Sequence, residues 1–153
     1  MTLPGVAIAV HLLGILWWIG GLAFVTLVFL PMLRHQPEGD RLALLQTIEG
    51  RFAPQARTAV LLVGLSGGYM LWALGAWRWL GQPGFWWLDA MIGYWLLFAV
   101  MLFIIEPLGL LQRMVFSARD PAAAWRRFHW LHGVLLALAV IVIAGAAAGA
   151  HGF

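Results

Sequence analysis

Long apolar stretches alternate with short polar segments along this chain. Four stretches, over residues 4–33, 58–77, 85–111 and 131–150, approach or exceed the roughly 20 apolar residues that a membrane-spanning helix requires. The segments between them contain the Gly, Pro, Asp and Gln residues that are typical of turns. The pattern predicts an all-α integral membrane protein, an antiparallel bundle of four transmembrane helices that forms a single domain over residues 1–153.

The polar connection after the first stretch contains a helical pattern of its own. Leu42, Leu45, Ile48 and Phe52 recur at close to helical spacing within residues 40–52. This segment is expected either to lie along the membrane surface as an amphipathic helix or to extend the second spanning helix.

Arginines are distributed unevenly among the connections. Eight of the nine lie in the first and third connections, and Arg78 alone lies in the second. Positive residues favour the cytoplasmic side of a membrane, so these two connections are predicted to be cytoplasmic and both termini non-cytoplasmic. The tryptophans of residues 77–87 would then form an outer aromatic belt, with Trp125 and Trp130 at the inner surface.

The composition favours lipid as the solvent and excludes several kinds of site. Hydrophobic residues make up 63% of the chain and charged residues 10%, against about 25% charged in soluble domains. There is no cysteine, which excludes disulfides and thiolate metal sites. The isoelectric point of about 10.6 arises from arginines that flank apolar segments, so we expect a lipid bilayer as the partner and no nucleic acid.

The first stretch carries a histidine in the hydrocarbon region. An ionisable side chain there costs at least about 2.5 kcal/mol, which makes His11 a functional candidate. Trp18 and Gly21 follow His11 on the same face of the predicted helix. Such a face either binds a flat cofactor or allows a neighbouring helix to approach closely, with His11 hydrogen-bonded across the bundle.

Small residues and methionines lie at a similar depth in the other predicted spans. Gly67, Gly68 and Gly93 would leave room for a bulky apolar ligand such as a porphyrin. Met70 and Met91 are candidate second ligands to a haem iron. The alternative is that both methionines fill the core.

Two further histidines lie near the predicted inner end of the fourth span. His129 and His132 are three residues apart and therefore share a helix face. Neutral imidazole ligates iron, copper and zinc, so both are candidate metal ligands. His11 and His132 are predicted to lie more than about 10 Å apart along the membrane normal, too far to ligate one iron.

Acidic residues also fall within the third predicted span. Glu106 precedes Pro107, which weakens the helix at that point. Glu106 is expected to be neutral, to pair with Arg113 or another inner arginine, or to carry protons. Asp89 lies near the outer end of the span, where it is expected at the membrane surface.

The stretch from His11 to Gly21 resembles the first-helix signature of the copper resistance protein D family. In this signature a histidine is followed seven residues later by tryptophan and then by a glycine pair. Arg51-Phe52 and Gly67 are similar to that family's next element. The resemblance covers the first half of the chain and implies a multi-pass protein of the bacterial inner (cytoplasmic) membrane that handles copper.

A weaker likeness connects the chain with the four-helix, haem-containing membrane protoporphyrinogen oxidases. It depends on His11 with the tryptophan and glycine that follow it, Leu30-Pro31, His35 and Arg127-Phe128. This likeness implies a haem at His11.

Three hypotheses of function follow. The first is a b-type haem protein that transfers electrons or, as an oxidoreductase, acts on a small redox molecule in the membrane, with His11 as axial ligand. The second is copper uptake or resistance through histidine and methionine ligands. The third is a non-catalytic small subunit or assembly factor that packs against a larger membrane complex or a second copy of itself.

Overall fold

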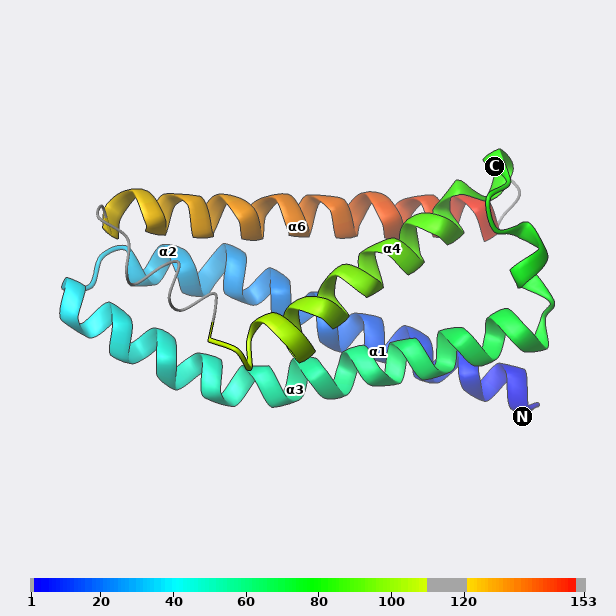
Figure 1. Cartoon of the computed structure of the whole chain (residues 1–153), viewed down its shortest axis with the longest axis horizontal. Coiled ribbons are helices and arrows are strands. Elements are labelled where there is room, and N and C mark those ends of the chain that lie inside the picture. The colour runs from blue at the N-terminus through cyan, green and yellow to red at the C-terminus, as the bar shows by residue number, and fades with distance from the viewer. Residues whose placement is uncertain (1, 110–120, 151–153) are drawn as a thin grey trace.

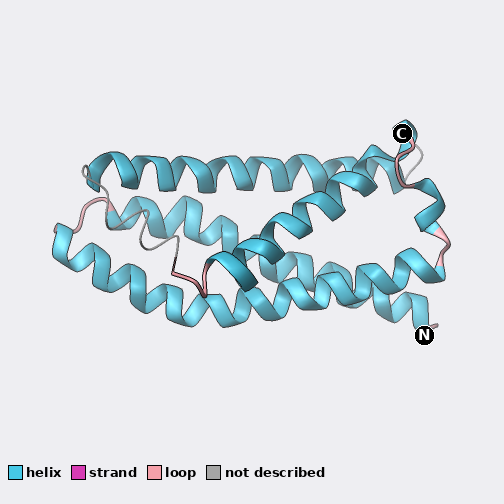
Figure 2. Cartoon of the chain, viewed as in Figure 1, coloured by secondary structure: helices cyan, strands magenta, loops and turns pink. Residues whose placement is uncertain are grey.

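The computed structural model describes the backbone of residues 2–109 and 121–150, and their side chains except those of residues 38, 39, 42, 121–124 and 150. Every regular element in these ranges is helical (Figure 2). The predicted all-α class is therefore confirmed.

The first half of the chain forms two long helical segments. Helix α1 (Leu3–Phe24) continues through a π-helical turn, η1 (Val25–Phe29), into the short helix α2 (Leu30–Leu33). After a turn the chain enters α3 (Glu38–Ala73), a helix of 36 residues that includes Pro54. Residues 40–52 are therefore part of the second long helix and not a separate surface helix.

The second half begins with two short 3₁₀ turns, η2 (Ala76–Trp79) and η3 (Pro83–Phe85). Helix α4 (Trp86–Val100) then continues into a second π-helical turn, η4 (Met101–Ile105). The last helix is α6 (Pro121–Ala150). Successive long helices run in opposite directions, so α1 begins and α6 ends at the same end of the molecule (Figure 1).

Three helical segments among the described residues are long and apolar enough to cross a membrane. They are Leu3–Leu33, Pro83–Ile105 and Trp125–Gly149. Many of their large apolar side chains are exposed, for example Leu16 at 70%, which suits contact with lipid and not with water. The chain is a multi-pass membrane protein by these properties.

The three segments overlap the first, third and fourth predicted spans. The second predicted span, residues 58–77, corresponds to the latter part of α3. That helix ends at Ala73, earlier than the predicted end at residue 77, because Gly75 adopts a left-handed conformation with φ of 64°. Helix geometry is also lost after Ile105, where Pro107 and the left-handed Gly109 follow. Part of the predicted third span, residues 110–111, lies outside the described ranges.

Helices α1 and α3 pack closely at a glycine. A Cβ atom on Gly14 would lie 2.8 Å from Cγ2 of Val63 and 3.6 Å from the carbonyl oxygen of Ala59. A buried cluster continues from this contact through Trp18, Leu22 and Phe98 of α4. The close approach of the two backbones brings His11 within reach of α3.

Candidate cofactor site

His11 is held by the backbone of the neighbouring helix α3. Its Nδ1 atom lies 3.1 Å from the carbonyl oxygen of Val63 and 3.1 Å from Oγ of Ser66. Because a carbonyl oxygen can only accept, Nδ1 carries the proton of the neutral ring. The second nitrogen, Nε2, is then unprotonated and presents a lone pair.

This arrangement is the one that proteins use for histidine ligands to metals. A ligating imidazole usually donates its other N–H to a backbone carbonyl or carboxylate, which fixes the tautomer and the ring orientation. Ser66 itself donates to the carbonyl oxygen of Leu62, 2.5 Å away, so its own proton is occupied. His11 is therefore preset in the tautomer that can bind a metal through Nε2.

A cavity of about 430 Å³ lies beside His11. Its volume falls within the range of about 300–1,000 Å³ that is typical of cofactor and small-molecule sites. The lining comes from α1, α3, α4 and α6 and is almost entirely apolar. The space next to the imidazole is thus large enough for a ligand.

Six of the residues selected from the sequence line this one cavity, namely His11, Trp18, Gly67, Gly68, Met70 and Met91. Gly67 lies directly against the imidazole, since a Cβ atom there would be 3.0 Å from Cε1 of His11. The structure therefore brings the candidate axial ligand and both candidate thioether ligands around the same space.

Gly21 lies elsewhere. A Cβ atom on Gly21 would be 3.1 Å from Cε1 of Phe52, so this glycine allows α3 to pack against α1. It lines a smaller cavity of about 130 Å³, which His132 and Phe98 also line. Its part is in helix packing and not in the lining of the His11 cavity.

Aromatic side chains that the sequence did not single out form much of the cavity wall. Tyr94 and Trp95 are fixed by hydrogen bonds, since Tyr94 donates to the carbonyl oxygen of Leu135 at 3.0 Å and Trp95 Nε1 to that of Val60 at 2.9 Å. Trp18 and Trp87 also line the cavity, and their buried Nε1 atoms make no hydrogen bond within the described part of the chain. Nε1 of Trp87 lies against α6, since it is the atom nearest to a Cβ atom placed on Gly149.

His132 lines a different cavity, of about 200 Å³. Its Nδ1 lies 3.0 Å from the carbonyl oxygen of Phe128, one turn earlier in α6. His11 and His132 are therefore in separate sites, as expected from their predicted depths. His129 lines neither the His11 cavity nor the His132 cavity.

Glu106 forms an ion pair across two helices. Its Oε1 lies 3.4 Å from a terminal nitrogen of Arg57, and Nε of Arg57 donates to the carbonyl oxygen of Leu102 at 3.0 Å. An ion pair with an inner arginine is one of the three alternatives expected from the sequence, and the partner is Arg57. Arg113 lies outside the described residues. Asp89 accepts from the backbone N–H of Gly81 and closes the connection between α3 and α4.

Within residues 2–109 and 121–150, no three His, Cys, Asp or Glu side chains converge as a metal site. Comparison of the chain with protein-family models, with curated proteins and with solved structures finds no match. The function is therefore inferred from the residues of this chain.

Proposed function

We propose that this chain is a small inner-membrane protein that binds b-type haem beside His11 and acts in electron transfer or membrane redox chemistry. The observation that supports it best is the hydrogen bond from His11 Nδ1 to the Val63 carbonyl oxygen, in a histidine that lines an apolar cavity of about 430 Å³. A histidine in this tautomer, in a mostly apolar site of cofactor size, is suited to ligate a haem iron.

Each wall of the cavity has a part in this proposal. His11, which Val63 and Ser66 hold, would bind the haem iron, and Met70 or Met91 would supply the second ligand. A bound haem supplies one-electron redox chemistry. The apolar lining excludes water and thereby influences the reduction potential.

The proposed membrane topology has four spans with both termini on the non-cytoplasmic side. The latter part of α3 would be the second span, antiparallel to α1 (Figure 1). Eight of nine arginines then lie on the cytoplasmic side. In this orientation the His11 cavity lies in the outer half of the membrane and the His132 cavity in the inner half.

Copper binding is the second candidate, because two methionines and a histidine line one cavity. Thioether sulfur is a soft ligand that favours Cu(I). Under this alternative His11, Met70 and Met91 would hold the ion directly.

The absorption spectrum of the purified protein tests the proposal. We expect protein from haem-supplied cells to show a Soret band, which His11→Ala removes and the control His129→Ala leaves unchanged. The control removes an imidazole that lies outside the cavity. A colourless wild-type protein, or a band that survives in His11→Ala, would contradict the haem proposal; colourless protein with one bound copper would favour the second candidate.

A further inference from the structure

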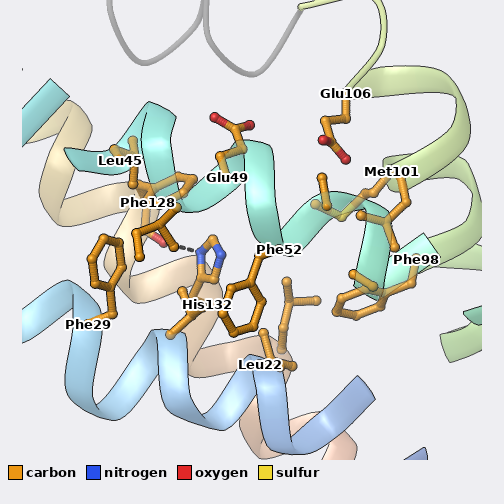
Figure 3. A pocket seen from close by; sticks show the side chains of 16 residues that line it. Leu22, Phe29, Leu45, Glu49, Phe52, Phe98, Met101, Glu106, Phe128 and His132 are labelled. Atoms are coloured by element: carbon orange, nitrogen blue, oxygen red, sulfur yellow. Dashed lines mark hydrogen bonds between the residues drawn. The ribbon is translucent and has the colours of Figure 1, made fainter. Parts of the chain in front are cut away.

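The cavity at the opposite end of the helices has walls suited to a flat ring. It has a volume of about 200 Å³, and four phenylalanines from η1, α3, α4 and α6 contribute to its lining, namely Phe29, Phe52, Phe98 and Phe128. The side chains surround a central space next to the imidazole of His132 (Figure 3).

The polar groups that face this space are hydrogen-bond acceptors. His132 uses Nδ1–H on the Phe128 carbonyl oxygen, so Nε2 of the neutral ring is an acceptor. The Glu106 carboxylate is directed into the cavity, whereas that of Glu49 is directed away from His132 (Figure 3). A ligand that satisfies both His132 and Glu106 must therefore supply two donors.

The charge balance favours a neutral donor over a cation. Glu106 and Glu49 both line the cavity; Glu106 is paired with Arg57 at 3.4 Å, and the Glu49 carboxylate is directed away from His132 (Figure 3). The pair leaves little net charge to stabilise a buried ammonium group. Hydroxyl groups donate hydrogen bonds without bringing a charge into the apolar space.

Two π-helical turns border the same cavity. Val25 and Phe29 come from η1, and Met101 and Leu102 from η4. π-turns are rare and occur frequently at functional sites. Each of these turns is followed by a proline, Pro31 or Pro107. Because proline has no N–H, one regular i→i−4 hydrogen bond of the helix cannot form there. Wide turns on two different helices at one cavity point to a ligand there.

We propose that this cavity binds the dihydroxy ring of a quinol taken from the membrane. One hydroxyl group donates to Nε2 of His132 and the opposite hydroxyl to the Glu106 carboxylate. The phenylalanines contact the faces and edges of the ring. The quinol is held more tightly than the quinone, because the quinone has only acceptor oxygens and faces the same acceptors.

The donor requirement is tested with a matched pair of probes, tetramethyl-1,4-hydroquinone and its dimethyl ether. Binding to the full chain in lipid nanodiscs is measured by calorimetry without oxygen. We expect the hydroquinone to bind at least about fivefold more tightly than the ether, since each lost hydrogen bond to an acceptor reduces affinity by about that factor. Equal affinities, or preferential binding of protonated 2-phenylethylamine, would overturn the proposal.

Two variants and one control locate the site. His132→Phe keeps a ring but removes one of the two acceptors, and is expected to reduce the preference for the hydroquinone by about fivefold. Ala56→Leu fills the cavity without changing a polar group and is expected to weaken binding of both probes, so it decides the question if His132→Phe does not fold. His129→Phe, outside the cavity, should bind as wild type; unchanged binding in Ala56→Leu would place the ligand elsewhere.

This binding measurement does not depend on haem. A colourless protein that prefers the hydroquinone would support the quinol site and contradict the haem proposal. A protein that shows a Soret band but binds the two probes equally would support the haem proposal and contradict the quinol site.

Discussion

At the scale of the residue, glycines in α3 determine which aromatic rings can approach it. A Cβ atom on Gly64 would overlap the indole ring of Trp95, whereas one on Gly68, a turn further on, would meet nothing within 4 Å. Trp95 is not free to move aside, because its Nε1 donates to the Val60 carbonyl oxygen at 2.9 Å. The packing of Trp95 therefore requires glycine at position 64, whereas position 68 has room for a larger side chain.

This difference predicts opposite effects of the same substitution. Gly64→Ala should destabilise the protein by about 1–3 kcal/mol, the usual cost of overpacking. Gly68→Ala should be neutral or slightly stabilising, since alanine is the better helix former. Thermal unfolding in detergent, followed by circular dichroism, measures both. Equal midpoints for the two variants would contradict the packing described for Trp95.

Periodicity was sufficient to place His11 and Trp18 on the buried face of the first helix. It could not reveal that Val63 holds the imidazole, because a backbone carbonyl on another helix has no signature in the sequence. The aromatic wall could not be predicted either. Nothing in the sequence distinguishes Tyr94 and Trp95 from other aromatic residues of a membrane helix, and only the packing of α4 against α1 and α3 places them in the cavity wall. Periodicity alone was not sufficient for Gly21, which shares a helix face with His11 but does not line the His11 cavity.

At the scale of the element, Arg57 connects α3 to the end of α4. It pairs with Glu106 and also donates to the Leu102 carbonyl oxygen, within the π-turn η4. The two charged side chains are 33% and 20% exposed, so water screens the pair only in part. Removal of Arg57 would leave both a half-buried carboxylate and a carbonyl oxygen without their partner.

A double-mutant cycle tests this connection. Arg57→Met should lower stability by about 1–3 kcal/mol, the range for a lost hydrogen bond to a charged group. Adding Glu106→Gln should recover part of the loss, because the uncompensated charge is then removed. Denaturant unfolding of the two single variants and the double variant gives the coupling energy. A double variant as unstable as the sum of the singles would show that the pair contributes nothing.

Apolar stretches were a good guide to the helices and a poorer guide to their ends. The second span was predicted to continue to residue 77, but local geometry at Gly75 ends α3 earlier. The two π-turns were not predicted, because they differ from α-helix by one hydrogen-bond register. Pro31 and Pro107 are the signals that were available for them.

At the scale of the whole molecule, the alternation of helix directions agrees with the arginine distribution. α1 begins and α6 ends at one end, and α3 and α6, which carry Arg41 and Arg126 near their first residues, begin at the other (Figure 1). The apolar pattern could predict the helices because each span must satisfy its own backbone in lipid. The cavities could not be predicted, since they result from how side chains of several helices fit together.

The absence of cysteine makes the topology directly measurable. We expect Gln82→Cys, between η2 and η3, to react with an impermeant maleimide in intact spheroplasts. Asp40→Cys, at the start of α3, should react only after lysis. Both side chains are exposed, and the cysteine-free parent provides the background. The reverse pattern would invert the proposed orientation.

The central claim is that Nε2 of His11 is the ligand of a haem, and imidazole rescue tests it most directly. His11→Gly removes the ligand and leaves space where the ring was. The account predicts that this variant loses the Soret band and that added imidazole restores it, with no effect on the wild type. A band that is unaffected by the substitution, or a loss that imidazole does not restore even though the variant remains folded, would contradict it.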